Sequence, residues 1–376
     1  MKKIIINSGS TFKGGSEQVA LSFIHECKEY NEIEFYVVIG ENLRSQIDMQ
    51  SFPMNFQFYV LSKRPASNLF TFIKSMLWYR KLENEVKPDC VIATGGHGYW
   101  KPKAPLIAGF NIPHYLYPES PYLSRQSLQK RFYWLLKKQI DMCFFKRVDA
   151  YLAQTDDVNR RIRKLMKSDN VITVANTVHS CFYNPVQTNK KLQSKENGEV
   201  RMLTLSSYYP HKNIEILNKV IPELRKRGYD NIKFVLTLPK NKFETVINKN
   251  VRESIINIGA VPIEECPSLY EEVDFLFLPT LLECFSASYA EAMIMGKPIL
   301  TSDLGFAHTV CDDAAEYFDP LDAVDISNKI ISLIQDEEKQ KNMKDAGKKR
   351  VVMLNTAKER AEKYIEICKK FSTEND

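Results

Sequence analysis

The sequence lacks the spacings that would point to metal, redox or membrane-spanning chemistry. Its eight cysteines are scattered, with none of the close CxxC pairs that a zinc site or a redox motif needs. Its six histidines show no HxxxH or HExxH spacing, and no DxD triplet is present to hold a metal ion against a diphosphate. We therefore expect reduced thiols, no essential metal and no cofactor.

Long apolar runs and a strong charge imbalance are missing as well. No stretch approaches the ~20 apolar residues that span a bilayer, and the three isoleucines after Lys3 are too few for a signal peptide. This predicts a cytoplasmic protein. The net charge of +6 does not by itself indicate nucleic acid, and it is compatible with an anionic substrate or an acidic membrane face.

The length and the apolar pattern that are present indicate two α/β domains. A chain of 376 residues suits two domains of ~150 to 200 residues, which implies a cleft between them. Strand and helix patterns alternate from residue 4, break off in a polar stretch at 183–199 and then restart. We predict an N-terminal domain at 1–182, a linker at 183–199, a C-terminal domain at 200–355, and a last helix within 356–376 for which crossing back to the N-terminal domain is one alternative.

The densest functional pattern lies between Leu278 and Pro320. Glu283 is predicted on a loop directly after a strand, and Glu291 follows eight residues later, about two turns into the next helix. The start of that helix, at Ser286 and Ala287, offers unpaired backbone N–H groups and a positive dipole, which suit a diphosphate. One carboxylate can then reach a sugar and the other a ribose.

This segment resembles the retaining glycosyltransferases of the GT-B fold known as glycosyltransferase group 1, or family 4. Their hallmark is two glutamates separated by seven residues, and the stretches EAM with GKP, TSDLGF and AAEYFDP add to the match. The resemblance implies two Rossmann-like, doubly wound domains facing a central cleft. The N-terminal domain would bind the acceptor, and the C-terminal domain would bind a nucleotide-diphosphate sugar as co-substrate, with Glu283 on the sugar hydroxyls and Glu291 on the ribose.

Other segments extend the resemblance over nearly the whole chain. Gly14 and Gly15 look like the family's GGxE loop, residues 174–179 look like its interdomain PNGVD, and Lys212 lies where its phosphate-binding lysine lies. His114 resembles the family's cleft histidine. The resemblance assigns catalysis to Lys212, Glu283 and His114. It assigns donor binding to Gly14, Gly15, Lys212, Asn213, Glu283, Cys284, Phe285, Ser286, Ala287 and Glu291.

The sequence departs from the family pattern in two places. The usual EGFG is ECFS here, so that Cys284 and Ser286 replace two glycines and reduce the freedom of the loop. The arginine that usually precedes the phosphate lysine is absent, because serines occupy residues 206 and 207. The diphosphate would then depend on Lys212, the helix start and another cation such as Lys240.

Plain structural roles are the alternatives for several of these residues. Ser288 and Glu291 have the spacing of a capping box, so Glu291 could serve only its own helix. Lys212 could be a surface lysine, and the two glycines at 14 and 15 a simple turn. His114 could be a structural histidine, in which case His97 is its rival for the cleft role.

Two segments, 68–81 and 126–148, mix basic residues with aromatic and aliphatic ones. They are predicted to be basic amphipathic helices, which either lie on an anionic membrane surface or turn a solvated basic face outward. Helices that lie on a membrane surface would bring the enzyme to a lipid-linked acceptor.

The sequence as a whole predicts a metal-independent hexosyltransferase-type enzyme that extends a glycan or lipid-linked acceptor in surface polysaccharide biosynthesis. Two alternatives stay open. One is a GT-B sugar-nucleotide epimerase, and the other is a non-catalytic nucleotide-sugar-binding subunit of a glycosyltransferase complex, which the missing arginine favours.

Overall fold

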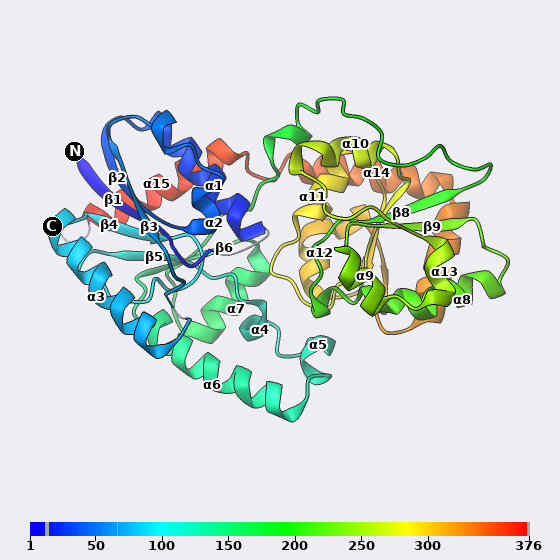
Figure 1. Ribbon diagram of the computed structural model, residues 1–376, viewed down its shortest axis with the longest axis horizontal. Helices are drawn as coiled ribbons and strands as arrows, with labels where there is room; N and C mark the ends of the chain where they lie inside the picture. The colour runs from blue at the N-terminus through cyan, green and yellow to red at the C-terminus, as the bar shows by residue number, and fades with distance from the viewer. Residues whose placement is uncertain (12–14, 66, 374–376) are drawn as a thin grey trace. The chain divides into compact units, whose positions relative to one another are not determined.

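The computed structural model describes residues 1–11, 15–65 and 67–373, and the chain forms two compact α/β units (Figure 1). Unit 1 consists of Met1–Pro118, Arg125–Thr177 and Asn355–Asp376, and unit 2 consists of Glu119–Ser124 and Val178–Leu354. The chain therefore passes from one unit to the other after residues 118, 124, 177 and 354.

The predicted linker at 183–199 is instead part of unit 2. The backbone N–H of Thr188 donates to Ser268 Oγ at 3.2 Å, and the N–H of Leu192 donates to Glu272 Oε2 at 2.8 Å. Leu192 is buried among its neighbours. These contacts explain why a polar, irregular stretch is fixed to one unit rather than strung between two.

Unit 1 is built on a seven-stranded parallel sheet in the order β3-β2-β1-β4-β5-β6-β7. Its strands are near-continuous apolar runs, as is usual for parallel strands covered on both faces. The strands are β1 Lys2–Ser8, β2 Ile33–Gly40, β3 Phe56–Leu61, β4 Cys90–Ala93, β5 Leu106–Gly109, β6 Ala150–Ala153 and β7 Val171–Thr173. The helices are α1 Gly15–Glu26, η1 Cys27–Glu29, α2 Glu41–Arg44, η2 Met49–Ser51, α3 Leu69–Val86, α4 Pro113–Leu116, α6 Leu128–Phe145, α7 Asp156–Met166 and α15 Ala357–Thr373.

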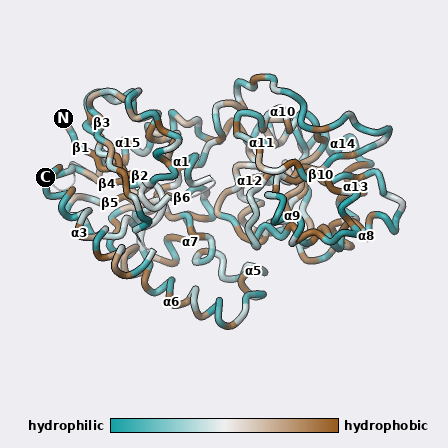
Figure 2. The backbone as a smooth tube through the Cα atoms, viewed as in Figure 1, coloured by the Kyte–Doolittle hydropathy of each residue, from teal (hydrophilic) through white to brown (hydrophobic). Residues whose placement is uncertain are grey.

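Unit 2 repeats this plan with a six-stranded parallel sheet in the order β10-β9-β8-β11-β12-β13. Figure 2 shows apolar stretches recurring along the interior elements of both units. The strands are β8 Val200–Thr204, β9 Ile232–Leu236, β10 Ile255–Asn257, β11 Phe275–Leu278, β12 Ile299–Ser302 and β13 Ala315–Phe318. The helices are α5 Pro121–Ser124, η3 Ser180–Phe182, η4 Pro210–Lys212, η5 Ile214–Ile216, α8 Leu217–Lys226, α9 Lys240–Val246, η6 Lys249–Ser254, η7 Ile263–Glu265, α10 Cys266–Glu271, α11 Ala287–Ile294, α12 Gly305–Cys311, η8 Asp312–Ala314, α13 Ala323–Gln335 and α14 Glu337–Val351.

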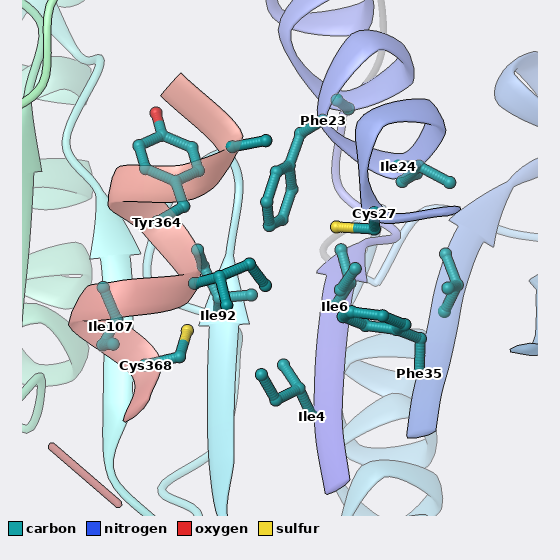
Figure 3. Close-up of a cluster of buried hydrophobic side chains, with 14 of the residues drawn as sticks. Ile4, Ile6, Phe23, Ile24, Cys27, Phe35, Ile92, Ile107, Tyr364 and Cys368 are labelled. Atoms are coloured by element: carbon teal, nitrogen blue, oxygen red, sulfur yellow. The ribbon is translucent and has the colours of Figure 1, made fainter. Parts of the chain in front are cut away.

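The C-terminal helix α15 completes the core of unit 1. Figure 3 shows Tyr364 and Cys368 of this helix in one buried apolar cluster with Ile92 and Ile107 of the sheet. The Tyr364 ring also meets the Phe23 ring of α1 edge-on, with centroids 5.1 Å apart. Of the two alternatives for this segment, the structure therefore places it with the N-terminal part of the chain.

Candidate active site

The candidate site of unit 2 lies where its strand order reverses. Strands β8 and β11 pair side by side, with Met202 opposite Phe275 and Leu203 opposite Leu276, although β9 and β10 lie between them in sequence. In doubly wound sheets, ligands bind beyond the carboxyl ends of the strands at this reversal. The segment after β8 carries Lys212, and the segment after β11 carries Glu283.

Hydrogen bonds hold these two segments together. The backbone N–H of Leu281 donates to the His211 carbonyl at 2.7 Å, and Thr280 Oγ1 donates to Glu283 Oε1 at 3.0 Å. Lys212 Nζ forms an ion pair with the same Glu283 oxygen. Both side chains are mostly buried, at 14% and 12% exposed, so the pair is fixed in position with a small part open to a ligand.

Asn213 forms the turn that follows Lys212. Its backbone is left-handed, with φ of 55°, a conformation that glycine and asparagine adopt most readily. Its side-chain amide donates to the Pro320 carbonyl at 2.8 Å. The amide thus ties the lysine segment to the loop after β13 while the backbone makes its turn.

Helix α11 places Glu291 deep in unit 2. Ser288 Oγ donates to the Leu205 carbonyl at 3.1 Å, which joins the helix to the end of β8. The residue at the N-cap is Ser286, without a side-chain cap bond, and Glu291 accepts from Tyr270 Oη at 3.1 Å. The capping-box alternative for Ser288 and Glu291 is therefore wrong.

The burial of Glu291 changes its acidity. Removal from water raises the pKa of this carboxyl to about 7, against the opposing influences of the Tyr270 hydrogen bond and the Lys212 charge. The side chain is 6% exposed. A carboxyl that titrates near neutral pH, beside a charged lysine, is typical of a functional position.

The loop between β11 and α11 holds the remaining predicted donor residues. Cys284 and Ser286 are buried, whereas Phe285 and Ala287 are partly exposed. The replacement of two glycines by Cys284 and Ser286 is thus accommodated by burying both side chains. The first N–H groups of α11 have no acceptor within their own helix, as at any helix start.

The histidines predicted for the N-terminal part and Gly15 lie in unit 1. The His114 ring, in α4, stacks on Trp134 of α6 with centroids 4.1 Å apart. His97 is buried, and its Nε2 lies 3.5 Å from Asp141 Oδ1. Gly15 begins α1, and Gly14 lies outside the described residues.

His97 therefore has a structural partner. Burial would raise the pKa of Asp141, but hydrogen bonds from His97, Lys137 and Tyr115 lower it to about 2. The resulting carboxylate joins α6 to α4 and to the loop after β4. This gives His97 a structural role, while the cleft role of His114 stays a prediction.

The loop in which the usual arginine is missing has a cation beside it, although not the predicted one. Lys242 Nζ lies 5.8 Å from the centre of the Tyr208 ring, and Lys242 belongs to α9, which follows β9. Lys240, which the sequence suggested, is exposed at the start of the same helix. Tyr208 in turn donates to Glu215 through its hydroxyl group.

A second group of residues next to the candidate site has no recognisable sequence pattern. Ser120 Oγ donates to the Leu281 carbonyl at 2.6 Å, and the Tyr122 ring lies edge-on to the His211 ring with centroids 5.8 Å apart. Both residues belong to the short segment Glu119–Ser124, which leaves unit 1 and packs in unit 2. The segment supports the backbone that carries Glu283, and only the fold reveals it.

Two classes of site receive no support from the described part of the chain. There, no three His, Cys, Asp or Glu side chains gather as a metal site would require. Every helix in that part also falls short of the length and apolarity that a membrane span needs.

The comparison with protein families identifies unit 2. Residues 186–350 match the family model described as glycosyl transferases group 1. The predicted resemblance to glycosyltransferase group 1 is thus confirmed over this segment of unit 2. The matched residues include the loop that carries Lys212 and both glutamates of the candidate site.

Two curated glycosyltransferases are similar to parts of the chain. The O-antigen chain mannosyltransferase B of Escherichia coli is 32% identical over 93 residues, which is 24% of each protein. The uncharacterized glycosyltransferase MJ1178 of Methanocaldococcus jannaschii is 28% identical over 174 residues, 44% of this chain and 47% of that protein. The chain thus matches less than half the length of either relative.

Solved structures share the fold of the chain over nearly its full length. WaaG, a glycosyltransferase involved in lipopolysaccharide biosynthesis, has a TM-score of 0.73 with 13% identity, covering 97% of this chain and 99% of WaaG. HepE (Alr3699) of Anabaena, solved with UDP and glucose, has a TM-score of 0.67 with 12% identity, covering 98% of this chain and 99% of HepE. The predicted α/β class with two Rossmann-like units of the GT-B type is confirmed.

Proposed function

We propose that this chain is a retaining, metal-independent glycosyltransferase that moves a hexosyl group from a nucleotide-diphosphate sugar to a glycan or lipid-linked acceptor. The observation that carries the proposal is the ion pair of Lys212 with Glu283 at the β8 and β11 switch point, with Glu291 buried on the adjoining helix. A cation, a sugar-binding carboxylate and a ribose-binding carboxylate are the groups that such a donor requires.

In the proposed reaction, the acceptor hydroxyl oxygen attacks the anomeric carbon from the side on which the diphosphate leaves. The bond from that carbon to the β-phosphate oxygen breaks, and the hydroxyl proton passes to the departing phosphate. Lys212 Nζ and the N–H groups at the start of α11 stabilise the negative charge that develops there. Glu283 holds the sugar hydroxyls, and His114 of unit 1 would contact the donor sugar.

The names of the similar proteins guide the choice of substrates. HepE was solved with UDP and glucose, the Escherichia coli relative is a mannosyltransferase, and WaaG works in lipopolysaccharide biosynthesis. For this chain we therefore propose a role in surface polysaccharide biosynthesis, in the cytoplasm and peripheral to the membrane that carries the acceptor. UDP is the first nucleotide to test.

The test is turnover by the purified single chain. Nucleotide-diphosphate sugars are supplied with glycan acceptors in EDTA, and NMR reads the anomeric configuration of the product. We expect transfer with retention, and a loss of ~100-fold or more in kcat for Glu283→Gln, with exposed Glu271→Gln as the matched control. Binding without turnover would instead indicate a non-catalytic subunit, and conversion of the sugar nucleotide without acceptor would indicate an epimerase.

A further inference from the structure

Helix α6 turns its apolar side away from the core of unit 1. Leu128, Phe132, Leu136 and Ile140 follow one another at intervals of four residues, so they lie along one face of the helix. Their side chains are 50–79% exposed. A helix on the surface of a globular protein normally buries such a stripe against the core, whereas α6 exposes it to solvent.

Helix α3 adds to the same exposed surface. Leu69, Phe70, Ile73 and Leu77 are also exposed, and three of them share the four-residue spacing. The two helices touch through Phe72 and Phe144, whose ring centroids are 5.5 Å apart. Figures 1 and 2 show both helices at the margin of unit 1, with apolar positions along their length. We call the exposed apolar residues of the two helices the α3–α6 face, which consists of Leu69, Phe70, Ile73, Leu77, Leu128, Phe132, Tyr133, Leu135, Leu136 and Ile140.

Positive charge borders this apolar surface. From residue 125 to residue 147 the only acidic residue is Asp141, which is buried and paired with Lys137. On α3, Lys74 Nζ lies 4.3 Å above the Phe70 ring. On α3, the exposed acidic residue Glu85 is paired with Lys81. The basic residues in the two helices or next to α6 are Lys74, Arg80, Lys81, Arg125, Lys130, Arg131, Lys137, Lys138, Lys146 and Arg147.

We propose that the α3–α6 face is the surface by which this enzyme docks on an anionic lipid membrane. Apolar side chains would enter the boundary between headgroups and acyl chains, and the bordering lysines and arginines would meet the lipid phosphates. An unpartnered apolar face with an almost purely basic rim complements that surface in both respects. The face extends the proposed function, because it would bring the acceptor-binding part of the enzyme to a lipid-linked acceptor.

The helices are held rigidly enough to present this face as a unit. Asp141 accepts from Tyr115 Oη at 2.7 Å and pairs with Lys137, which anchors the inner side of α6. Phe145, at the end of the helix, packs on Phe110 with centroids 4.3 Å apart. Docking therefore needs no refolding of α6, whose outer side is already exposed.

The experiment is flotation of the full-length protein with vesicles of phosphatidylcholine, with and without phosphatidylglycerol, in the absence of donor and acceptor. We expect binding only to the anionic vesicles, and binding that weakens as salt is raised. The double variant Phe132→Ser/Leu136→Ser should lose on the order of tenfold or more in partitioning. Lys130→Glu/Arg131→Glu should lose binding most at low salt.

The matched control is Val352→Ser/Met353→Ser, which removes two exposed apolar side chains that lie outside the face. This control should bind vesicles like the wild type. A fluorophore on Cys143, the exposed cysteine of α6, gives a second reading, because its emission should shift to the blue on anionic vesicles. All variants should keep the wild-type circular dichroism and their turnover on a water-soluble acceptor.

Two results would overturn the proposal. The first is a wild-type protein that ignores anionic vesicles at low salt. The second is a wild-type dimer that Phe132→Ser/Leu136→Ser converts to a monomer without any effect on vesicle binding, which would make the face a contact between two copies. Loss of turnover with intact vesicle binding would count against the proposed function alone.

Discussion

At the scale of single residues, the sequence pattern predicts the local structure around Glu283 and Glu291 but not all of the side chains that contact them. The spacing of Glu283 and Glu291 predicts one on a loop and one on a helix, and the structure places them so. The hydrogen-bond donor to Glu291 is Tyr270 of α10, and a donor to Glu283 is Thr280, just after β11. The Tyr270 contact has no local sequence signature, because it depends on how α10 packs against α11. The same holds for Lys212, which reaches Glu283 from 71 residues away in the chain.

The buried carboxyl of Glu291 predicts a link between pH and stability. Its pKa of about 7 in the folded protein exceeds the ordinary value of 4.5, so the folded state retains a proton that the unfolded chain releases. The resulting stabilisation is fully present below about pH 4.5 and is lost as the pH rises through about 7. Glu291→Gln should therefore be more stable than the wild type above pH 7, by on the order of 1–3 kcal/mol.

This prediction is checked by urea unfolding across that pH range. The advantage of Glu291→Gln should shrink toward zero as the pH approaches 4.5, while exposed Glu271→Gln should follow the wild type throughout. The same variant should bind nucleotide more weakly, if the carboxylate holds the ribose. A variant that is less stable than the wild type at high pH would show that the ionised carboxylate is well satisfied in the folded protein.

At the scale of elements, apolar periodicity predicts most strands and helices, because buried parallel strands and amphipathic helices carry their burial in the sequence. The apolar residues at 257–261 favour a strand there, whereas the strand in the structure is β10 at Ile255–Asn257. The membership of the short segment Glu119–Ser124 was beyond prediction. Six residues give too little pattern to show which core they join.

That segment leads to a prediction about catalysis. Ser120 donates to the carbonyl of Leu281, two residues before Glu283, so Ser120→Ala should loosen the loop that positions the carboxylate. We expect a ~5- to 30-fold loss of kcat/KM, the equivalent of ~1 to 2 kcal/mol for a buried hydrogen bond. Steady-state kinetics with the donor varied would measure it.

Ser124→Ala is the control for this experiment, since Ser124 is exposed in the same segment and bonds only locally to the Pro121 carbonyl. A positioning role predicts that the loss in Ser120→Ala falls mainly on kcat, with the melting temperature little changed. Equal kinetic constants for the two variants would show that Ser120 does not help to position Glu283.

At the scale of the whole molecule, the restart of the strand pattern predicts two α/β units, but the boundaries require the contacts. The chain passes between the units four times, after residues 118, 124, 177 and 354, whereas a pattern read along the sequence suggests one linker. The prediction of a linker at 183–199 is wrong because polar residues indicate only that a segment is exposed. Exposure does not show which unit the segment packs against.

The placing of α15 in the core of unit 1 predicts a stability effect confined to that unit. Tyr364 is buried against Phe23, so Tyr364→Ala should cost ~3 to 5 kcal/mol of the stability of unit 1. Calorimetry should show the unfolding transition of unit 1 at a lower temperature. The unfolding transition of unit 2, recognised because a bound nucleotide raises its temperature, should not move. Exposed Glu366→Ala, on the same helix, should change neither, and a Tyr364→Ala protein that melts like the wild type would contradict this view of the core.

The central claim, a nucleotide-diphosphate site around Lys212, is tested most directly by a thermal-shift panel of UDP, GDP, ADP, CDP and dTDP. The proteins are the wild type, Lys212→Ala and, as control, Lys226→Ala, an exposed lysine in the last turn of α8. Each ligand shift is read against the same variant without ligand, which separates binding from any loss of stability. We predict that one diphosphate, at ~100 times its Kd, stabilises the wild type and the control by ~2.7 kcal/mol and that Lys212→Ala loses most of this effect. Equal stabilisation of Lys212→Ala and the wild type, or no response to any of the five, would contradict the site.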